Sequence, residues 1–273
     1  MLQDRLIITV APNGAYKQAI DHPALPLNAV ELAKTAKQCL DAGAAMLHLH
    51  IRDADGRHSL DVATYQDALR VVKAAVGNSM VLQITSEAAG VYQAQEQINM
   101  VRAVRPEAVS VGLRELDQPD IGEQGLGEFF EWLAQERMMT QIILYDTVDL
   151  QRWQDLRQRG VVPQAPWFLL FVLGRYSTNQ TSNPKDLLPF LNEHTGGEPW
   201  AICAFGNAEH ACVTAAAALG GHVRVGFENN LKLKNNLIAP DNAALVLQVV
   251  DAAHCLGRPL ASANDIRQQF GVN

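Results

Sequence analysis

Cysteine is scarce in this 273-residue sequence, and its scarcity removes two classes of protein. The four cysteines are Cys39, Cys203, Cys212 and Cys255, and no two of them are spaced as Cys-x-x-Cys. That spacing is typical of thiolate zinc knots and redox sites, and small secreted proteins need a denser set of cysteines for their disulfides. We therefore expect four free thiols that pack as small apolar side chains.

The sequence also has fewer positive than negative residues and contains no long apolar run. Lys and Arg number 22 against 29 Asp and Glu, which gives a formal net charge of −7. Such a chain offers no cationic surface to nucleic acid or to an anionic membrane, so local cations must bind any anionic substrate. The first residues lead straight into a strand pattern, and we predict no signal peptide, no membrane span and a cytoplasmic location.

The sequence does contain a regular alternation of short apolar runs and longer helical patterns. Hydrophobic residues make up 48% of the chain and charged residues 19%, which suits a large core. The predicted strands are 6–11, 46–51, 80–85, 108–111, 141–145, 167–173, 200–205 and 222–227. Eight such strands, each followed by a helix, predict an α/β fold that closes as a (β/α)8 TIM barrel. An open doubly wound sheet is the alternative fold.

Capping signals mark several of the helices between these strands. Asn28, followed by Glu31, resembles a capping box, and Gly43 can end the same helix. Asp61 and Gly77 can bracket the next helix. The further predicted helices are 95–104, 126–136, 150–159, 187–194, 208–219 and 242–256, with an extra C-terminal helix at 263–270. No linker divides the chain, so we expect residues 1–273 to form one domain.

Two histidines, His48 and His50, lie two residues apart on the second predicted strand. Side chains alternate between the faces of a strand, so both imidazoles point to the same side. We expect that side to be the barrel interior, near the carboxyl end of the strand, where barrel enzymes have their active sites. Neutral imidazoles there are good ligands for zinc and related metals, although two packed core histidines are the alternative.

The eighth predicted strand repeats this alternation. Its apolar residues would face the helices, while His222, Arg224 and Glu228 would face inward. Strands two and eight both adjoin strand one in a closed barrel, so Glu228 can complete a metal site with His48 and His50 that leaves positions open for substrate or water. A simple ion pair between Glu228 and Arg224 is the alternative, because inward charges are costly unless they are paired or functional.

Two blocks of the sequence resemble the β-keto acid cleavage enzymes, whose type member cleaves 3-keto-5-aminohexanoate in lysine fermentation. These blocks are His-Leu-His-Ile-Arg at 48–52 and Gly-Gly-His-Val-Arg-Val-Gly-Phe-Glu at 220–228. Weaker matches extend the resemblance over nearly the whole chain, at 8–15, 21–26, 42–44, 56–57, 171–174 and 257–261.

The resemblance implies a zinc-bearing (β/α)8 barrel, usually a homotetramer. It would exchange a β-keto acid and acetyl-CoA for acetoacetate and a new acyl-CoA. Carried over by position, the zinc ligands are His48, His50 and Glu228, and the arginine near the metal is Arg224. Zinc would act as a Lewis acid on the substrate's keto and carboxylate oxygens.

The same resemblance gives a set of substrate-binding residues. Thr85, Ser86 and Ser110 lie at the ends of two strands, where their hydroxyls can bind the substrate carboxylate or cap the following turns. Asn13 and Tyr16, in the first loop, complete the set.

The sequence departs from the family pattern at Asn229. The family usually has an aspartate here, directly after the zinc-binding glutamate, that is thought to act as a base. An amide does not accept a proton at neutral pH. Arg224 and Asn229 are nevertheless the predicted catalytic positions, and Asp146 and Glu115 are the acids nearest to replace the base.

A second departure concerns the substrate. The amino-hexanoate enzyme has a glutamate where this chain has Tyr16, and that glutamate would pair the substrate's ammonium group. We therefore predict a β-keto acid without a cationic group. Arg175, Lys232 and Lys234 are candidates to meet substrate or CoA phosphates, or are simply solvated cations.

Three other functions stay open. A metal-dependent hydrolase of the amidohydrolase type also uses His-x-His, but strands 108–111, 141–145 and 167–173 lack its further ligands. A zinc barrel that binds a keto acid or CoA without turnover fits Asn229. A phosphate-binding barrel rests only on Gly206 and Gly226, which is a weak signal.

Overall fold

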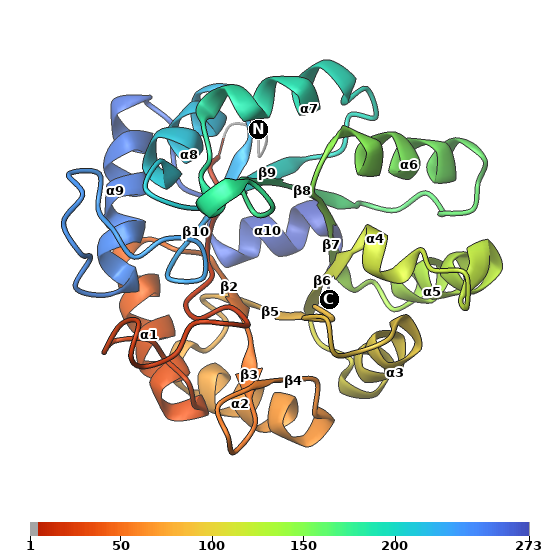
Figure 1. Ribbon diagram of the computed structural model, residues 1–273, viewed down its shortest axis with the longest axis horizontal. Helices are drawn as coiled ribbons and strands as arrows, with labels where there is room; N and C mark the ends of the chain where they lie inside the picture. The colour runs from red at the N-terminus through yellow and green to blue at the C-terminus, as the bar shows by residue number, and fades with distance from the viewer. Residues whose placement is uncertain (1–4, 273) are drawn as a thin grey trace.

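The computed structural model describes residues 5–272, in which eight parallel strands close into a barrel (Figure 1). The barrel strands are β1 Ile8–Val10, β2 Met46–Leu49, β5 Val81–Thr85, β6 Ala108–Gly112, β7 Met139–Leu144, β8 Phe168–Leu173, β9 Trp200–Ala204 and β10 His222–Val225. Closure is complete because β1 pairs with both β2 and β10. The TIM barrel is therefore confirmed with all eight predicted strands, and the open doubly wound sheet is excluded.

The helices surround the barrel, except for the last one, which lies behind its centre in Figure 1. They are α1 Ala29–Ala42, α2 Val62–Val76, α3 Ala94–Val104, α4 Leu113–Leu116, α5 Gly122–Gln135, α6 Thr147–Gln158, α7 Leu188–Glu193, α8 Glu209–Ala218, α9 Asn242–Cys255 and α10 Ala263–Phe270, with 3-10 turns η2 Thr178–Gln180 and η3 Pro184–Leu187. The predicted caps of α1 are confirmed, since the Asn28 side chain accepts from the N–H of Glu31 and Gly43 takes a left-handed φ of 115°.

Several short elements were not predicted from the sequence. A hairpin of β3 Ile51–Arg52 and β4 His58–Ser59 follows β2, and α4 follows β6 directly. These elements are too short to show a periodic apolar pattern. The helix predicted at 150–159 begins earlier, at Thr147, because Asp146 is its N-cap and accepts from the N–H of Asp149 at 3.0 Å.

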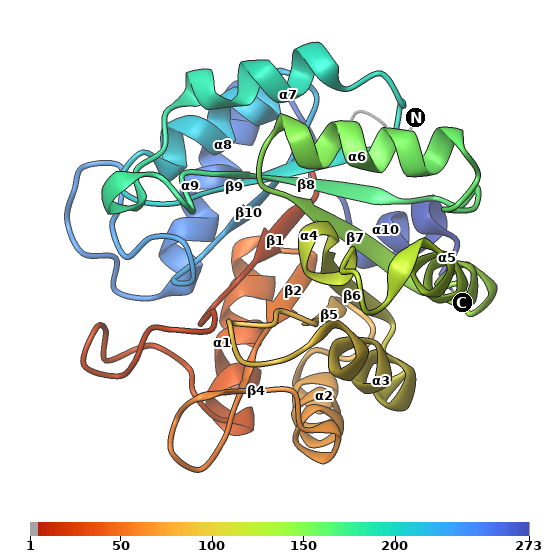
Figure 2. The same cartoon turned by 45° about the vertical axis from the view of Figure 1, so that its right-hand side comes forward.

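The apolar core has two parts, one on each side of the barrel wall. Leu47 and Leu49 of β2 belong to the part that packs against the surrounding helices, whereas Met46 belongs to the barrel interior. Ile266 and Phe270 of α10 join the interior part, so this helix lies across the end where the strands begin (Figure 2). The carboxyl ends of the strands are left for polar residues.

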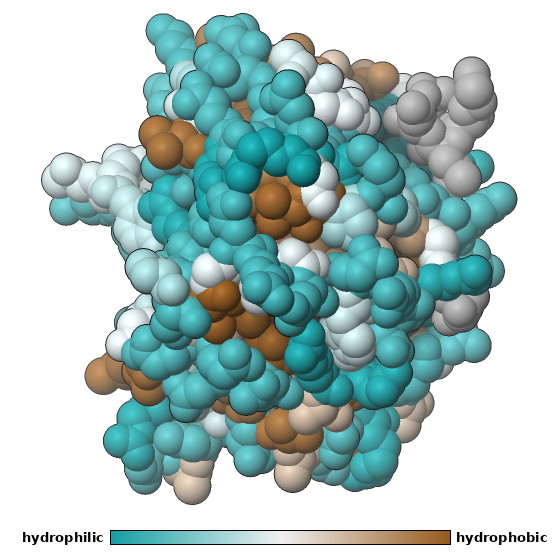
Figure 3. Space-filling model, turned by 90° about the vertical axis from the view of Figure 1, so that its right-hand side faces the viewer, coloured by the Kyte–Doolittle hydropathy of each residue, from teal (hydrophilic) through white to brown (hydrophobic). Residues whose placement is uncertain are grey.

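The surface gives no sign of a membrane-spanning segment. None of the described helices is both long and apolar enough to cross a bilayer. The face on the side of α4, α5 and α6 is largely hydrophilic, with small separated apolar patches (Figure 3). All four cysteines are free, as predicted, although Cys255 is exposed and the other three are buried.

Candidate metal centre

His48, His50 and Glu228 come together at the carboxyl end of the barrel. His48 lies on β2, His50 directly follows that strand, and Glu228 lies in the turn after β10. Because β1 separates β2 from β10, the two segments approach each other across one strand. One ligand atom from each of the three residues lies within 4.8 Å of the other two. The three predicted ligands are thus brought together.

The sequence pattern suggested that strand alternation directs Glu228 inward. In the structure, a turn after β10 does so. The strand ends at Val225, and Gly226 then takes a φ of 138°, which L side chains rarely adopt. A Cβ at Gly226 would lie 2.3 Å from the carbonyl oxygen of Ala11. A Cβ at Gly14 would lie 2.5 Å from Cγ of Glu228. These two glycines therefore let the turn bring the carboxylate against the first strand and its loop.

The two imidazoles direct their Nε2 atoms to one point. His48 Nε2 lies 3.1 Å from His50 Nε2, and these atoms lie 3.5 Å and 3.4 Å from Glu228 Oε2. The Nδ1 atom of His48 lies 2.8 Å from Oε1 of Gln83, which fixes the proton on Nδ1 and leaves the lone pair on Nε2. Burial lowers the pKa of His48 to about 4 and that of His50 to about 3, so both rings are neutral at pH 7.

Glu228 supplies the third donor. Its Oε1 accepts a charge-assisted hydrogen bond from Arg224 at 2.8 Å, so the predicted ion pair exists beside the ligand cluster. Burial favours a raised pKa for Glu228, but the charge of Arg224, with His48 and His50, lowers the pKa well below its usual value. Its Oε2 is buried without a hydrogen-bond partner among the described residues.

These donors fit a divalent metal. Two imidazole nitrogens and one ionised carboxylate oxygen converge on one point, and a cation at that point would offset the repulsion between their lone pairs. A His2Glu set is the ligand set of several catalytic zinc sites, and it leaves positions for water or substrate.

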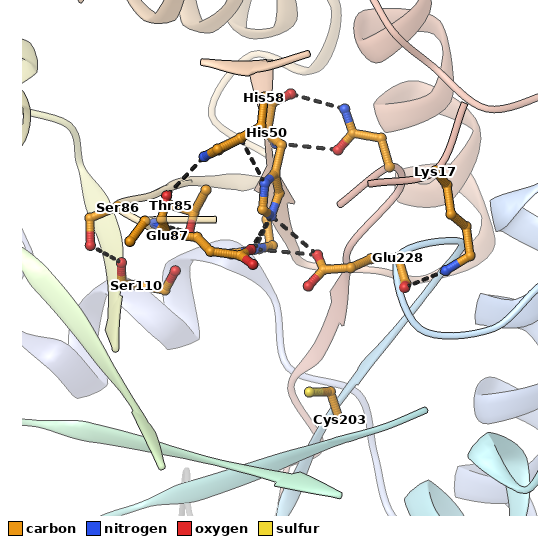
Figure 4. A network of polar contacts seen from close by, with 12 residues as sticks. Lys17, His50, His58, Thr85, Ser86, Glu87, Ser110, Cys203 and Glu228 are labelled. Atoms are coloured by element: carbon orange, nitrogen blue, oxygen red, sulfur yellow. Dashed lines mark hydrogen bonds and ion pairs between the residues drawn. The ribbon is translucent and has the colours of Figure 1, made fainter. Parts of the chain in front are cut away.

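Asn13 and Lys17 hold the backbone of the ligands. The Asn13 side chain donates from Nδ2 to the carbonyl oxygens of His50 at 2.9 Å and Pro26 at 3.1 Å, and its Oδ1 accepts from the N–H of His50 at 3.3 Å. Lys17 donates from Nζ to the carbonyl oxygen of Glu228 at 2.7 Å (Figure 4). Asn13, which was expected to bind substrate, therefore has its polar atoms directed to the chain itself.

The three hydroxyls predicted to bind substrate differ in their contacts. Thr85 Oγ1 accepts from the N–H of Glu87 at 3.0 Å, and Ser86 Oγ donates to the carbonyl oxygen of Ser110 at 3.2 Å (Figure 4). The Ser110 hydroxyl is buried, and no hydrogen-bond partner for it lies in the described part of the chain. Two of the hydroxyls thus support the turn after β5, as the capping alternative expected, and Ser110 keeps an unpaired donor.

Asn229 contacts α8. Its Nδ2 donates to Glu209 Oε1 and to the carbonyl oxygen of Arg224, each at 3.2 Å. Glu209 also accepts from the N–H of Gly226 and from Nδ2 of Asn230, each at 3.2 Å. Burial raises the pKa of Glu209 to about 8. The amide at position 229 therefore helps this carboxyl group to fix the turn that carries Glu228.

The two acids named from the sequence as replacement bases have structural partners. Asp146 caps α6 and forms an ion pair with Arg114 at 2.7 Å. Glu115 accepts from the N–H of Ala88 at 3.0 Å and from Gln97 Nε2 at 2.9 Å. Both are therefore engaged with the turns and helices around them.

Glu87 is the acid next to the ligands, and the sequence reasoning missed it. Its Oε2 lies 3.8 Å from Nε2 of His50 (Figure 4). Its Oε1 lies 3.4 Å from Arg175. Burial raises the pKa of Glu87 to about 7. One signal was present, since Glu87 follows the inward-facing Thr85 by two residues and would share its side of the sheet.

A cavity of about 250 Å³ opens beside the ligand cluster. It is lined by Asn13, Gly14, Ala15, Tyr16, Lys17, Asp21, Glu87, Arg175, Gln180 and Glu228. Tyr16 and Arg175, which the sequence singled out, therefore line the same space, and the Arg175 guanidinium lies 4.8 Å from the centre of the Tyr16 ring. Lys232 and Lys234 are not among the lining residues.

Comparison with known proteins gives matches over almost the whole chain. A family model described as beta-keto acid cleavage enzyme matches residues 5–272. The 3-keto-5-aminohexanoate cleavage enzyme of Acetoanaerobium sticklandii is 26% identical, with 99% of each chain covered. The 3-oxoadipate:acetyl-CoA acetyltransferase of Cupriavidus necator is also 26% identical, with 97% of this chain and 94% of the relative covered.

Solved structures share the barrel. The ternary complex of ObcA with a C4-CoA adduct and oxalate has a TM-score of 0.74 at 15% identity and covers 91% of this chain and 68% of that one. The type I 3-dehydroquinate dehydratase of Clostridium difficile has a TM-score of 0.57 at 13% identity and covers 90% and 92%. At such identities these likenesses show the fold alone. The family match over residues 5–272 carries the assignment, and the chain belongs to the β-keto acid cleavage enzyme family.

Proposed function

We propose that the protein is a zinc-dependent enzyme that converts a β-keto acid and acetyl-CoA into acetoacetate and a new acyl-CoA. The observation that carries the proposal is the convergence of His48 Nε2, His50 Nε2 and the unpartnered Glu228 Oε2 in a chain of this family. The name of the Cupriavidus necator relative, a 3-oxoadipate:acetyl-CoA acetyltransferase, supports the pairing of a keto acid with acetyl-CoA.

The residues around the ligands have defined tasks in this proposal. Zinc, when bound, polarises the substrate ketone as a Lewis acid. Arg224 keeps Glu228 ionised and in place through its 2.8 Å hydrogen bond. Gln83 holds the Nδ1 proton of His48, which keeps Nε2 available. The unpaired Ser110 hydroxyl is a donor for the substrate carboxylate.

The reaction requires one proton acceptor, and Glu87 is the carboxylate that lies beside the ligands. Its Oε2 takes a proton from C2 of the keto acid, and C2 attacks the thioester carbonyl of acetyl-CoA, which releases the CoA thiolate. The thiolate then attacks the original ketone carbon. The bond between C2 and C3 breaks, the new acyl-CoA leaves, and the proton returns from Glu87 to C2 of acetoacetate.

The cavity favours a keto acid without an amino group. Tyr16 carries no charge, and it stands against the Arg175 guanidinium at 4.8 Å. Tyr16 offers an ammonium group no carboxylate, and the Arg175 cation beside it would repel that group. The prediction that 3-keto-5-aminohexanoate is a poor substrate follows from this arrangement.

An assay with a substrate panel tests the proposal. The zinc-loaded protein is incubated with acetyl-CoA and each of several β-keto acids, and acetoacetate and new acyl-CoA are followed by mass spectrometry while metal content is measured. We expect product with at least one keto acid, and none with His48→Ala or Glu228→Gln. Absence of product across the panel, at about one zinc per chain, would instead assign a binding role. The cytoplasmic location and the homotetramer stay predictions.

A further inference from the structure

A cation lines the cavity that opens beside the candidate metal ligands. Arg175, in the loop after β8, lines the outer cavity of about 250 Å³ and also the narrow inner space, of about 20 Å³, that His48 and Arg224 line. Its side chain is 18% exposed. A guanidinium that has lost this much water needs acceptors for its five N–H groups.

The protein supplies few acceptors for this guanidinium. Within residues 5–272, Glu87 is the one polar partner of Arg175, at a distance of 3.4 Å. The rings of Tyr16 and Phe205 lie 4.8 Å and 5.1 Å from the guanidinium carbon. Aromatic rings of this kind hold the charged plane without using its N–H donors. Arg175 is therefore held in place with most of its donors available.

The distance from Arg175 to the metal ligands is short. One carboxylate spans it, because Glu87 lies 3.8 Å from His50 Nε2 through one oxygen and 3.4 Å from Arg175 through the other. A substrate held at the ligands by its keto acid end thus needs only a few carbon atoms beyond the ketone to bring a second charged group to Arg175. A second cation, Lys17, lines the same mouth.

We propose that Arg175 selects β-keto acids that end in a second carboxylate, an inference that rests on the function proposed above. The distal carboxylate binds the guanidinium through paired N–H···O bonds, and it replaces Glu87 as the partner of Arg175. Glu87 is then free to act on C2. The preferred substrate is a dicarboxylic β-keto acid.

A matched pair of substrates tests this inference. The six-carbon 3-oxoadipate ends in a carboxylate, whereas 3-oxohexanoate has the same chain length and ends in a methyl group. We expect wild type to prefer 3-oxoadipate in kcat/KM by about tenfold to a hundredfold, as a charge-assisted contact allows. Arg175→Gln should bring the ratio close to one, mainly through KM for the dicarboxylate, and Arg175→Lys should keep part of it. Arg70→Gln, at an exposed arginine of α2, is the matched control and should leave the ratio unchanged.

Binding to the zinc-loaded protein, measured by calorimetry, separates this inference from the proposed function. If no keto acid is turned over, but 3-oxoadipate binds more tightly than 3-oxohexanoate and only while Arg175 is present, the proposed function fails and the inference stands. A preference that survives Arg175→Gln overturns the inference, as does the absence of any preference in wild type. A loss of acetyl-CoA binding that exceeds the loss of dicarboxylate binding assigns Arg175 to CoA phosphates and also overturns it.

Discussion

The two ends of the barrel interior both hold buried histidines, and they use them differently. Near the start of β10, His222 accepts at Nδ1 from the N–H of Ile7 at 3.1 Å, and its ring packs edge-on against Phe168. At the carboxyl end, His48 and His50 direct Nε2 atoms toward each other at 3.1 Å. Burial lowers the pKa of His222 to about 3, much as it does for His50.

This comparison shows which features distinguish the candidate metal site from a packed core. Burial and a depressed pKa are common to both ends, so neither identifies a ligand. The difference is that the lone pairs at the carboxyl end converge, together with an unpartnered Glu228 oxygen, while the lone pair of His222 already has a donor. The convergence of unused acceptors, and not burial, therefore marks the candidate metal site.

The largest effect is expected from removing a ligand. His48→Ala and Glu228→Gln each take one donor from a three-residue site, so we expect loss of bound zinc and a fall in turnover of at least about a thousandfold. Metal content, measured beside circular dichroism, checks that the fold is retained. A variant that keeps both stoichiometric zinc and activity would contradict the assignment of its residue as a ligand.

A smaller but still large effect is expected from Glu87→Gln. The amide keeps the shape of the side chain but accepts no proton, so kcat should fall by about a hundredfold to ten-thousandfold. Zinc content should be unchanged, because Glu87 is not one of the three ligands. Asp146→Asn, at an acid that caps α6, is the matched control and should keep kcat near that of wild type. A kcat for Glu87→Gln within about threefold of wild type would exclude the proposed base.

The histidine at the other end provides the contrast. His222→Ala leaves the N–H of Ile7 without its acceptor and opens a cavity beside Phe168, so the free energy of unfolding should fall by about 2–4 kcal/mol. Urea unfolding measures this loss. Zinc content and kcat of the folded variant should match those of wild type. Zinc loss in His222→Ala at temperatures where it is folded would mean that the two ends are not independent.

The smallest effect concerns Glu209, whose carboxyl group accepts hydrogen bonds from Gly226 and Asn229 in the turn that carries Glu228. Burial raises the pKa of this group from its usual 4.5 to about 8, so the folded protein holds the proton more tightly than the unfolded chain. The stability that results is present below about pH 4.5 and is lost as the pH rises through 8. Glu209→Gln does not titrate, so its unfolding free energy should improve relative to wild type between pH 5 and 8. If the urea midpoints of wild type and Glu209→Gln instead change in parallel over that pH range, the protonation of Glu209 does not change on unfolding.

The barrel and the shared side of His48 and His50 were predictable because both depend on local periodicity. Eight apolar runs at regular spacing gave the strands, and alternation along β2 placed His48 and His50 on one side. The sequence pattern placed Glu228 beside the histidines by strand alternation, whereas in the structure its direction comes from the turn at Gly226. Alternation stops at the last strand residue, and a side chain beyond it is positioned by contacts across the barrel.

The remaining parts of the site depend on such contacts. The role of Asn13 follows from its hydrogen bonds to the backbone of His50, 37 residues away in sequence. Glu87 and Arg175 meet although 88 positions separate them in the chain. No window of sequence contains both members of these pairs, so their proximity appears only when the barrel closes.

The most direct test of the central claim follows the carbon atoms. The zinc-loaded protein is given acetyl-CoA labelled with ¹³C at both acetyl carbons, together with an unlabelled β-keto acid such as 3-oxoadipate. The account predicts acetoacetate that carries both labels at C3 and C4, an unlabelled new acyl-CoA, and neither product with His48→Ala. Unlabelled acetoacetate, or no acetoacetate from the zinc-loaded protein with any keto acid of the panel, would contradict it.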